Sequence, residues 1–167
     1  MATISLPKPP QELPLFDYSL MSFFEILGVE NALKLILCTM LEHQILVFSA
    51  DCQKLMLVCE SVMSLIHPFR WPHVYVPILP PMLENFLDAP VPFIMGLVRR
   101  THDMDLYNRA SVCIVDIDNG ELDLPEEVPD FPYEAELAEE IKNVIVKFGG
   151  RQGASMLKNQ ASCKHVR

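Results

Sequence analysis

The feature of this sequence that most constrains its fold is a short apolar run, Gln44–Phe48 (QILVF), between two segments with helical periodicity. A continuous run of β-branched and aromatic residues of this length predicts a strand that is buried on both faces. The segment after it, Cys52–His67, repeats apolar residues at steps of three and four and stops before Pro68, which predicts a helix. A buried strand that leads into a helix indicates an α/β fold.

The rest of the chain repeats this alternation of strands and helices. Short apolar runs predict further strands, and segments with helical spacing predict helices between and beyond them. We therefore predict an α/β fold with a mostly parallel or mixed sheet and helices on both of its faces. The expected helices are Ser19–Leu27, Val29–Glu42, the short Pro81–Leu87 and Tyr133–Phe148, and the expected further strands are Val74–Leu79, Phe93–Val98, Val112–Ile117 and the short Glu121–Leu124.

The two ends of the chain differ in composition from its middle. Residues 1–14 contain four prolines, which lack an amide donor and fix φ, so we expect a proline-rich linker there. Residues 15–148 carry the strand and helix patterns and form the predicted α/β module. Residues 149–167 begin with GGRQG, follow no clear pattern and contain only basic charges, so we expect an uncommitted basic tail.

Composition sets limits on the environment and the partners of the protein. The longest apolar run, Leu33–Leu41, is much shorter than the roughly 18 residues needed to span a bilayer, so we expect no direct membrane insertion. The first residues lack the pattern of a secretory signal, and the five cysteines form no C-x-x-C pair, both of which favour the reducing cytoplasm. The net charge of −9 disfavours nucleic acid, because binding phosphates requires a clustered basic face.

No sequence pattern points to a reaction or to a cofactor. Glycine loops that bind phosphates are absent, as is the G-x-S-x-G nucleophile motif, and no two histidines sit with a Cys or carboxylate at a ligand-like short spacing. His67 and His73 come nearest to a metal pair, but backbone hydrogen bonding in a loop explains them better. Ser49 is explained by capping the next helix, for which Asp51 is a second candidate. We expect no cofactor, and by elimination a protein-binding module.

Three stretches of the sequence, read together, resemble the central segment of DENN domains. They are Gly28–Ser49, Leu57–Gly96 and Val112–Leu122. The shared pattern is a leucine-rich helix, a strand that ends in Ser, and two motifs rich in proline and aromatic residues. Within the family the chain is most similar to the DENN proteins that also carry RUN and PLAT domains. The matching positions are Leu41, Glu42, Ser49, Pro68, Phe69, Trp71, Tyr75, Pro77, Leu79, Pro80, Ala89, Pro90, Pro92, Phe93 and Gly96.

This resemblance implies that the chain is part of a guanine-nucleotide exchange factor for Rab-family small GTPases, which promotes GDP release by binding the switch regions. No side chain need react chemically, because exchange depends on different affinities for the nucleotide-bound and the empty GTPase. Most motif residues then serve packing and turns, and the flanking loops supply the contacts. The candidate GTPase contacts are Asp88, Ala89, Pro90, Arg99, Arg100 and His102.

The resemblance leaves one alternative open and adds further expectations. The alternative is a Rab-binding effector or scaffold segment without exchange activity. In the family, an upstream lobe and a downstream segment complete the domain, so we expect this chain to be incomplete without them and weak or inactive as an exchanger alone. Apolar faces meant for those segments predict self-association. The resemblance places the protein in the cytoplasm, peripheral on Golgi or endosomal membranes through the GTPase.

Overall fold

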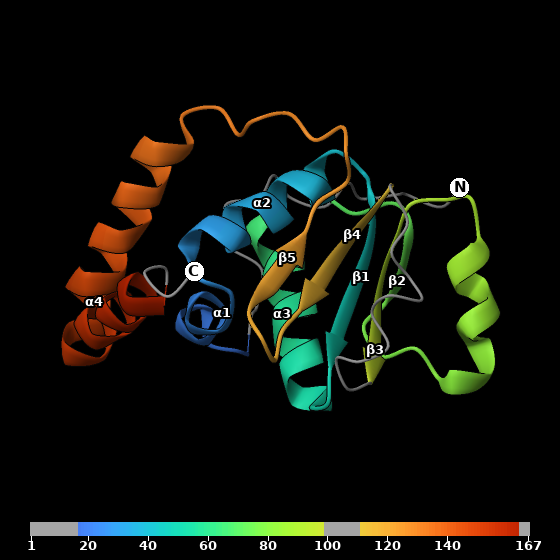
Figure 1. Cartoon of the computed structure of the whole chain (residues 1–167), viewed down its shortest axis with the longest axis horizontal. Helices are drawn as coiled ribbons and strands as arrows, with labels where there is room; N and C mark the ends of the chain where they lie inside the picture. Colours follow the sequence, from blue (N-terminus) through green and yellow to red (C-terminus); the bar gives the residue numbers. More distant parts are fainter. Residues whose placement is uncertain (1–16, 99–110, 164–167) are drawn as a thin grey trace, which may run out of the picture.

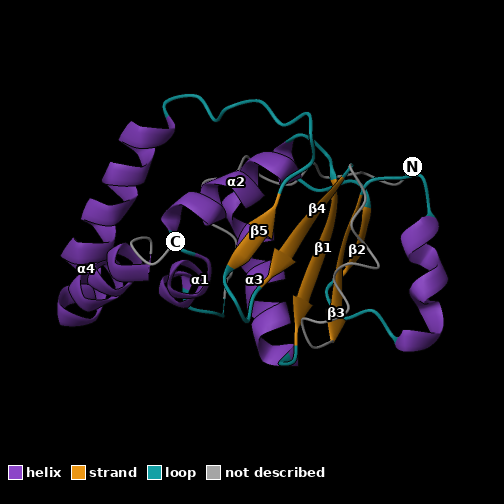
Figure 2. Ribbon diagram, viewed as in Figure 1, coloured by secondary structure: helices purple, strands orange, loops and turns teal. Residues whose placement is uncertain are grey.

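A five-stranded sheet forms the centre of the computed structural model, which describes residues 17–98 and 111–163 (Figures 1 and 2). The order of the strands is β2-β3-β1-β4-β5, so the first strand of the chain lies in the middle of the sheet. The strands are β1 (Gln44–Ser49), β2 (Val74–Val76), β3 (Phe93–Val98), β4 (Val112–Asp116) and β5 (Glu121–Asp123). The helices are α1 (Leu20–Leu27), α2 (Val29–Met40), α3 (Cys52–Leu65), the 3-10 helix η1 (Pro81–Asp88) and α4 (Glu134–Cys163).

The sheet is mixed, which confirms the predicted fold class. Strand β1 pairs in parallel with β3 on one side and with β4 on the other, and β2 pairs in parallel with β3. Only β5 is antiparallel among the described strands, because it returns from β4 through a tight turn. The four parallel strands therefore begin at one end of the sheet, here called the amino end, and finish at the other, the carboxyl end.

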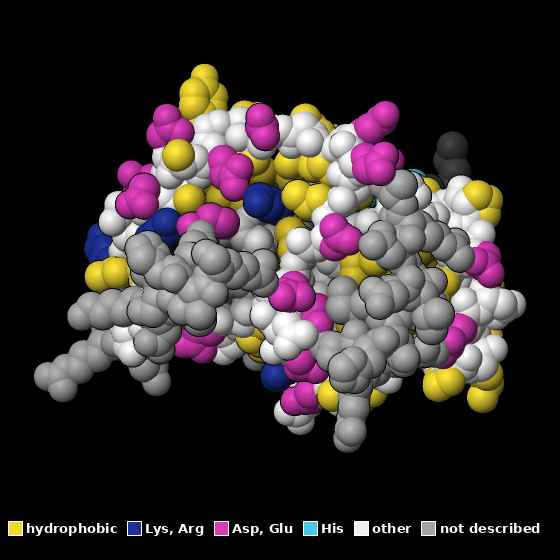
Figure 3. Space-filling model, viewed as in Figure 1, with side chains coloured by type: hydrophobic (Ala, Val, Ile, Leu, Met, Phe, Trp, Pro, Cys, Tyr) yellow, Lys and Arg dark blue, Asp and Glu magenta, His cyan; other side chains and the backbone are white. Residues whose placement is uncertain are grey.

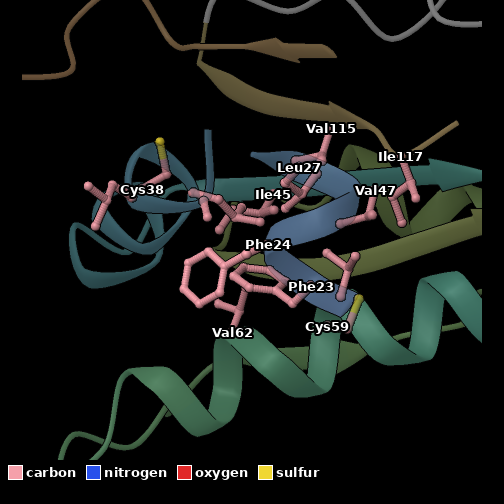
Figure 4. Packing of buried hydrophobic residues seen from close by; sticks show 14 of the residues in the cluster. Phe23, Phe24, Leu27, Cys38, Ile45, Val47, Cys59, Val62, Val115 and Ile117 are labelled. Carbon is pink, nitrogen blue, oxygen red and sulfur yellow. The ribbon is translucent and has the colours of Figure 1, made fainter. Parts of the chain in front are cut away.

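One face of the sheet packs against α1, α2 and α3. Alternate strand residues such as Ile45, Val47 and Val115 point into this core and are at most 1% exposed. Phe23 and Phe24 of α1 lie close to α3 in Figure 4, with their ring centroids 5.3 Å apart in an edge-to-face arrangement. The central strand β1 is a continuous hydrophobic run because both of its faces are buried, this one and the opposite one.

The opposite face of the sheet carries a second, separate cluster of buried side chains. Its strand members include Leu46, Phe48 and Met95. Leu79, which follows β2, and Leu87 of η1 pack on them, so η1 contributes to the cover of this face. The predicted helix on the second face is therefore present as a 3-10 helix, whose remaining side chains are largely exposed.

The edge strand β2 ends at Val76, immediately before Pro77, as expected for a residue that cannot donate to a ladder. The chain then stays close to β3, because the Leu79 amide donates to the carbonyl oxygen of Gly96 at 2.7 Å. A Cβ atom on Gly96 would overlap the carbonyl oxygen of Pro77. Gly96 is thus required by the close approach of two backbones.

Helix α4 forms an outer layer on α1 and α2 and departs from the predicted boundary at Phe148. It continues to Cys163, so the expectation that the helix ends at 148 was wrong. It is sharply bent: a Cβ on Gly153 would overlap the carbonyl oxygen of Ile145, whereas a straight helix would separate these residues by about 12 Å along its axis. Figure 1 shows the second half of α4 turning back toward α1. The division of the chain at residues 14 and 148 into linker, module and tail stays a prediction.

Candidate protein-binding surface

Three loops meet at the amino end of the sheet, where the parallel strands begin. They are the turn between α2 and β1, the segment between α3 and β2, and the loop between η1 and β3. The parallel register aligns their ends, since Ile45 is opposite Ile94 and Val74 is opposite Phe93. This end of the sheet therefore gathers residues that are far apart in the sequence.

The side chain of Gln44 fixes the loop that was predicted to contact the GTPase. Its amide nitrogen donates to the carbonyl oxygens of Ala89 at 2.8 Å and of Val91 at 3.1 Å. The carbonyl of Ala89 thus has a structural role, whereas Asp88 and Pro90 expose their side chains. The predicted contact residues in this loop are held in place and are accessible.

The other predicted contact residues follow β3 in the sequence. Arg99, Arg100 and His102 lie outside the described residues. Strand β3 begins at Phe93, just after the loop at the amino end, and ends at Val98, about 17 Å along a six-residue strand. Val98 therefore lies at the opposite end of β3 from the loop that contains Asp88, Ala89 and Pro90.

A second contact joins the other two loops at the amino end. His73 Nε2 lies 3.0 Å from Glu42 Oε2, which is within ion-pair distance when the histidine is protonated, although the geometry is not that of a hydrogen bond. Glu42 reaches this position from a left-handed backbone conformation, with φ at 57°. The Trp71 ring packs edge-on against the His73 ring at 5.1 Å and donates its Nε1 hydrogen to the carbonyl oxygen of Val74 at 3.0 Å.

These anchored loops present apolar side chains to solvent. Leu41 is 42% exposed, Phe69 63%, Val74 39% and Val91 43%. We call these four residues the amino-end patch. Sequence reasoning assigned most residues of this motif of prolines and aromatic residues to packing and turns, and the structure shows Phe69 exposed instead. A pattern of residue types cannot show that one aromatic ring of such a motif faces outward.

Helix η1 extends the apolar surface beside this patch. Met82 is 85% exposed and Phe86 51%, while Leu87 is buried in the core of the second face. In Figure 3, hydrophobic side chains are visible at the right-hand edge of the molecule, where Figure 1 places η1. At eight residues this 3-10 helix is long for its type, and both exposed side chains project from it.

The carboxyl end of the sheet has the opposite character, because its polar groups are occupied with one another. The Asp118 carboxylate accepts hydrogen bonds from the Ala50 amide at 2.7 Å, the Ser49 hydroxyl at 3.0 Å and the Lys54 ammonium at 2.9 Å. Burial alone would raise the pKa of Asp118, but these three donors outweigh it and hold the pKa below its ordinary value. Asp118 thus ties the turn after β4 to the turn after β1.

The remaining polar residues at this end also have structural roles. Asp51, and not Ser49, caps α3, since its carboxylate accepts from the Gln53 amide at 2.8 Å. The Ser49 hydroxyl accepts instead from the Asp51 amide at 3.0 Å. Buried Asp116 accepts from the backbone amides of Asp118 and Asn119 at 2.9 and 3.0 Å. Within the described residues no group of His, Cys, Asp and Glu is arranged to hold a metal ion.

Comparison with known proteins identifies the family. A model described as the DENN (AEX-3) domain matches residues 1–120, well over half of the chain. The chain belongs to the DENN domain family. The DENN match contains the amino-end patch and every described element from α1 to β4, and it ends before α4 begins. Assignment to the central segment of a DENN domain, and to members that carry RUN and PLAT domains, stays a prediction.

Two larger proteins contain a segment that is similar to this chain. DENN domain and WD repeat-containing protein SCD1 of Arabidopsis thaliana is 39% identical over 132 residues, which cover 77% of this chain and 11% of that protein. Elicitor of plant defense protein 1 of Gibberella zeae is 32% identical over 114 residues, which cover 68% of this chain and 10% of that protein. The chain thus spans about a tenth of the length of these two relatives. Across the described part of the chain, no helix combines the length and apolar character needed to cross a membrane.

Proposed function

We propose that this chain is part of a guanine-nucleotide exchange factor for Rab-family small GTPases, and that the amino-end patch contacts the GTPase. Membership of the DENN family supports the class of activity. The observation that carries the position of the contact is the set of exposed apolar side chains on three loops that are fixed by Gln44 and by the Glu42–His73 pair. Such a surface can bind a partner with little loss of loop entropy.

The proposed mechanism is differential binding. An exchange factor promotes GDP release when it binds the empty GTPase more tightly than the GDP-bound form, and no bond to a protein side chain is made or broken. A fixed apolar patch serves this purpose because it can select one arrangement of the switch regions. The acidic residues at its rim, Glu42 and Asp88, make the edge of the patch negative, which would orient a GTPase that has basic residues opposite them.

We place this proposed activity in the cytoplasm, on the surface of Golgi or endosomal membranes to which the GTPase itself would be attached. The chain represents about a tenth of its relatives, so the whole protein would supply the remaining GTPase contacts. We expect the isolated chain to bind weakly and the extended DENN domain to exchange nucleotide.

The test is release of a fluorescent GDP analogue from a panel of Rabs, with this chain and an extended DENN domain at matched concentration. Val91 and Val98 are both 43% exposed but lie at opposite ends of β3. We expect Val91→Glu in the extended domain to slow exchange by about tenfold or more, as for a central interface residue, and Val98→Glu to change it little. Val146→Glu, at a 46% exposed position of α4, is the neutral control.

Other outcomes would redirect the proposal. If Val98→Glu is the damaging change, the contact lies at the carboxyl end and the amino-end patch is not the site. If no Rab is exchanged but one binds in its GTP form, the chain belongs to an effector or scaffold and the exchange proposal is wrong.

A further inference from the structure

Helix α4, which lies outside the part of the chain matched by the family, carries its own exposed apolar row. Leu137 is 37% exposed, Val144 53% and Phe148 76%, and Ile141 between them is half-buried. Their spacing of four, three and four residues places all four on one side of a helix with roughly 3.6 residues per turn. We call these four residues the α4 seam.

The seam is separate from the face by which α4 packs on the rest of the protein. That face contains Ala138 and Ile145, which are 4% and 5% exposed, and Lys142, which lies 3.3 Å from Glu30 of α2. The bend beyond Phe148 limits the seam to the first, straight half of the helix. The seam therefore forms a short strip about 17 Å long beside the packed face.

Its spacing is that of a coiled-coil seam, in which apolar residues alternate at steps of three and four. A second copy of the helix running in the opposite direction, about a two-fold axis between positions 142 and 143, would oppose Leu137 to Phe148 and Ile141 to Val144. Every apolar residue of the seam then meets an apolar residue of the other copy. Such reciprocal pairing is the condition for a closed two-fold interface.

The charges beside the seam match the same arrangement. Glu140 and Lys147 are exposed on the flank of the seam that faces away from the packed face. In an antiparallel pair the two flanks face each other, and Lys147 of one copy lies within about 3 Å of the level of Glu140 of the other, a contact that the symmetry repeats. In Figure 3, acidic side chains gather at the upper left of the molecule, over the first turns of α4 in Figure 1, and basic ones lie lower along the helix. In a parallel pair Glu140 of one copy and Lys147 of the other would lie on opposite sides of the seam and could not make this contact.

We propose that the α4 seam is a dimerisation surface, and that its partner is a second copy of this chain in the antiparallel orientation. The proposal is independent of Rab binding, since α4 lies outside the amino-end patch. One pair of helices in contact over about 17 Å buries less than the 1,200–2,000 Å² of a stable interface, so we expect a weak dimer, with a dissociation constant on the order of 10–1,000 μM.

Sedimentation analysis of the chain over a concentration series tests the proposal. The weight-average mass should rise from the monomer value of 19.0 kDa toward twice that value as the protein concentration increases. Val144→Glu and Phe148→Glu should each raise the dissociation constant at least about tenfold, because each places two charges in the symmetric seam. Val146→Glu, at a 46% exposed position on another side of α4, should leave it unchanged.

A charge exchange separates the proposed geometry from a general loss of apolar surface. Lys147→Glu alone should weaken the dimer, and the double variant Glu140→Lys with Lys147→Glu should restore it. A chain that stays at 19.0 kDa at every concentration overturns the proposal. So does a dimer that Val144→Glu and Val146→Glu affect equally, or a double variant that fails to restore association, since either result excludes the antiparallel seam.

Discussion

Gln44 donates its side-chain amide to the carbonyl oxygen of Ala89 at 2.8 Å, and so links the first residue of the central strand to the loop before β3. The same amide reaches Val91. A residue at the start of a buried strand thereby controls a loop 45 positions away.

Replacing Gln44 by Ala should loosen this loop. Loss of two partly exposed hydrogen bonds should cost about 1–2 kcal/mol of unfolding free energy. Amide hydrogen exchange should become faster in the segment Asp88–Pro92 before it changes in the core strands. Gln53→Ala is a suitable control, because the Gln53 side chain is exposed and only its backbone amide is used, by the Asp51 cap. Equal acceleration in both variants would show that the Gln44 amide does not hold the loop.

The network around Asp118 should make stability depend on pH in the acid range. The pKa of Asp118 is lowered in the folded state, so its contribution is present above the unfolded pKa of about 3.9 and is lost as pH falls through the folded pKa. Asp118→Asn should therefore cost about 1 kcal/mol at pH 7 and at pH 5, and less at pH 3. Urea unfolding at the three pH values measures this difference. A cost that stays constant down to pH 3 would contradict the role of the charge.

Gly96 and Gly149 should respond in opposite ways to Ala. At Gly96 the new Cβ meets the carbonyl oxygen of Pro77, a backbone atom that cannot move without displacing the chain after β2. We expect a loss of about 2–3 kcal/mol. At Gly149 the Cβ meets the mobile end of the Met21 side chain, and Ala favours a helix over Gly by about 1 kcal/mol. Thermal unfolding of both variants checks the contrast, which fails if Gly149→Ala is the more damaging change.

The edge strand β2 should depend on one partly buried hydrogen bond. The Tyr75 hydroxyl donates to Glu60 Oε1 of α3 at 2.8 Å, and burial together with this bond raises the pKa of Tyr75 above its ordinary range. Tyr75→Phe should cost about 1–2 kcal/mol, because the ring still packs while the carboxylate loses its donor. Unfolding free energies of Tyr75→Phe and Glu60→Gln should show coupling in a double-mutant cycle. Strict additivity of the two changes would mean that the bond contributes nothing.

The sequence predicted the elements that follow from hydrophobic period alone. Strands β1 and β3 begin where expected, and α3 begins at Cys52, because a buried strand and an amphipathic helix have distinct apolar patterns. The second half of α4 was missed for a physical reason. Gly149 and Gly153 are typical of helix ends, and only the close approach of Gly153 to Ile145 shows why the bent helix requires glycine there.

The candidate surface was predicted in part. Asp88, Ala89 and Pro90 were selected from the sequence, and the structure places them at the amino end of the sheet. The exposure of Phe69 could not be predicted, because it depends on how three loops assemble. Ser49 was assigned to the helix cap from its position, but the cap is Asp51, since the Ser49 hydroxyl is bound to Asp118.

The residues that stabilise the fold and the residues proposed to bind a partner lie at opposite ends of the sheet. The carboxyl end locks two turns together through Asp118, far along the strands from the apolar loops. Substitutions at Leu41, Phe69 or Val91, on the proposed contact surface, should thus leave the hydrogen bonds of Asp118 intact. A fold arranged in this way can diverge toward new partners during evolution without first having to regain lost stability.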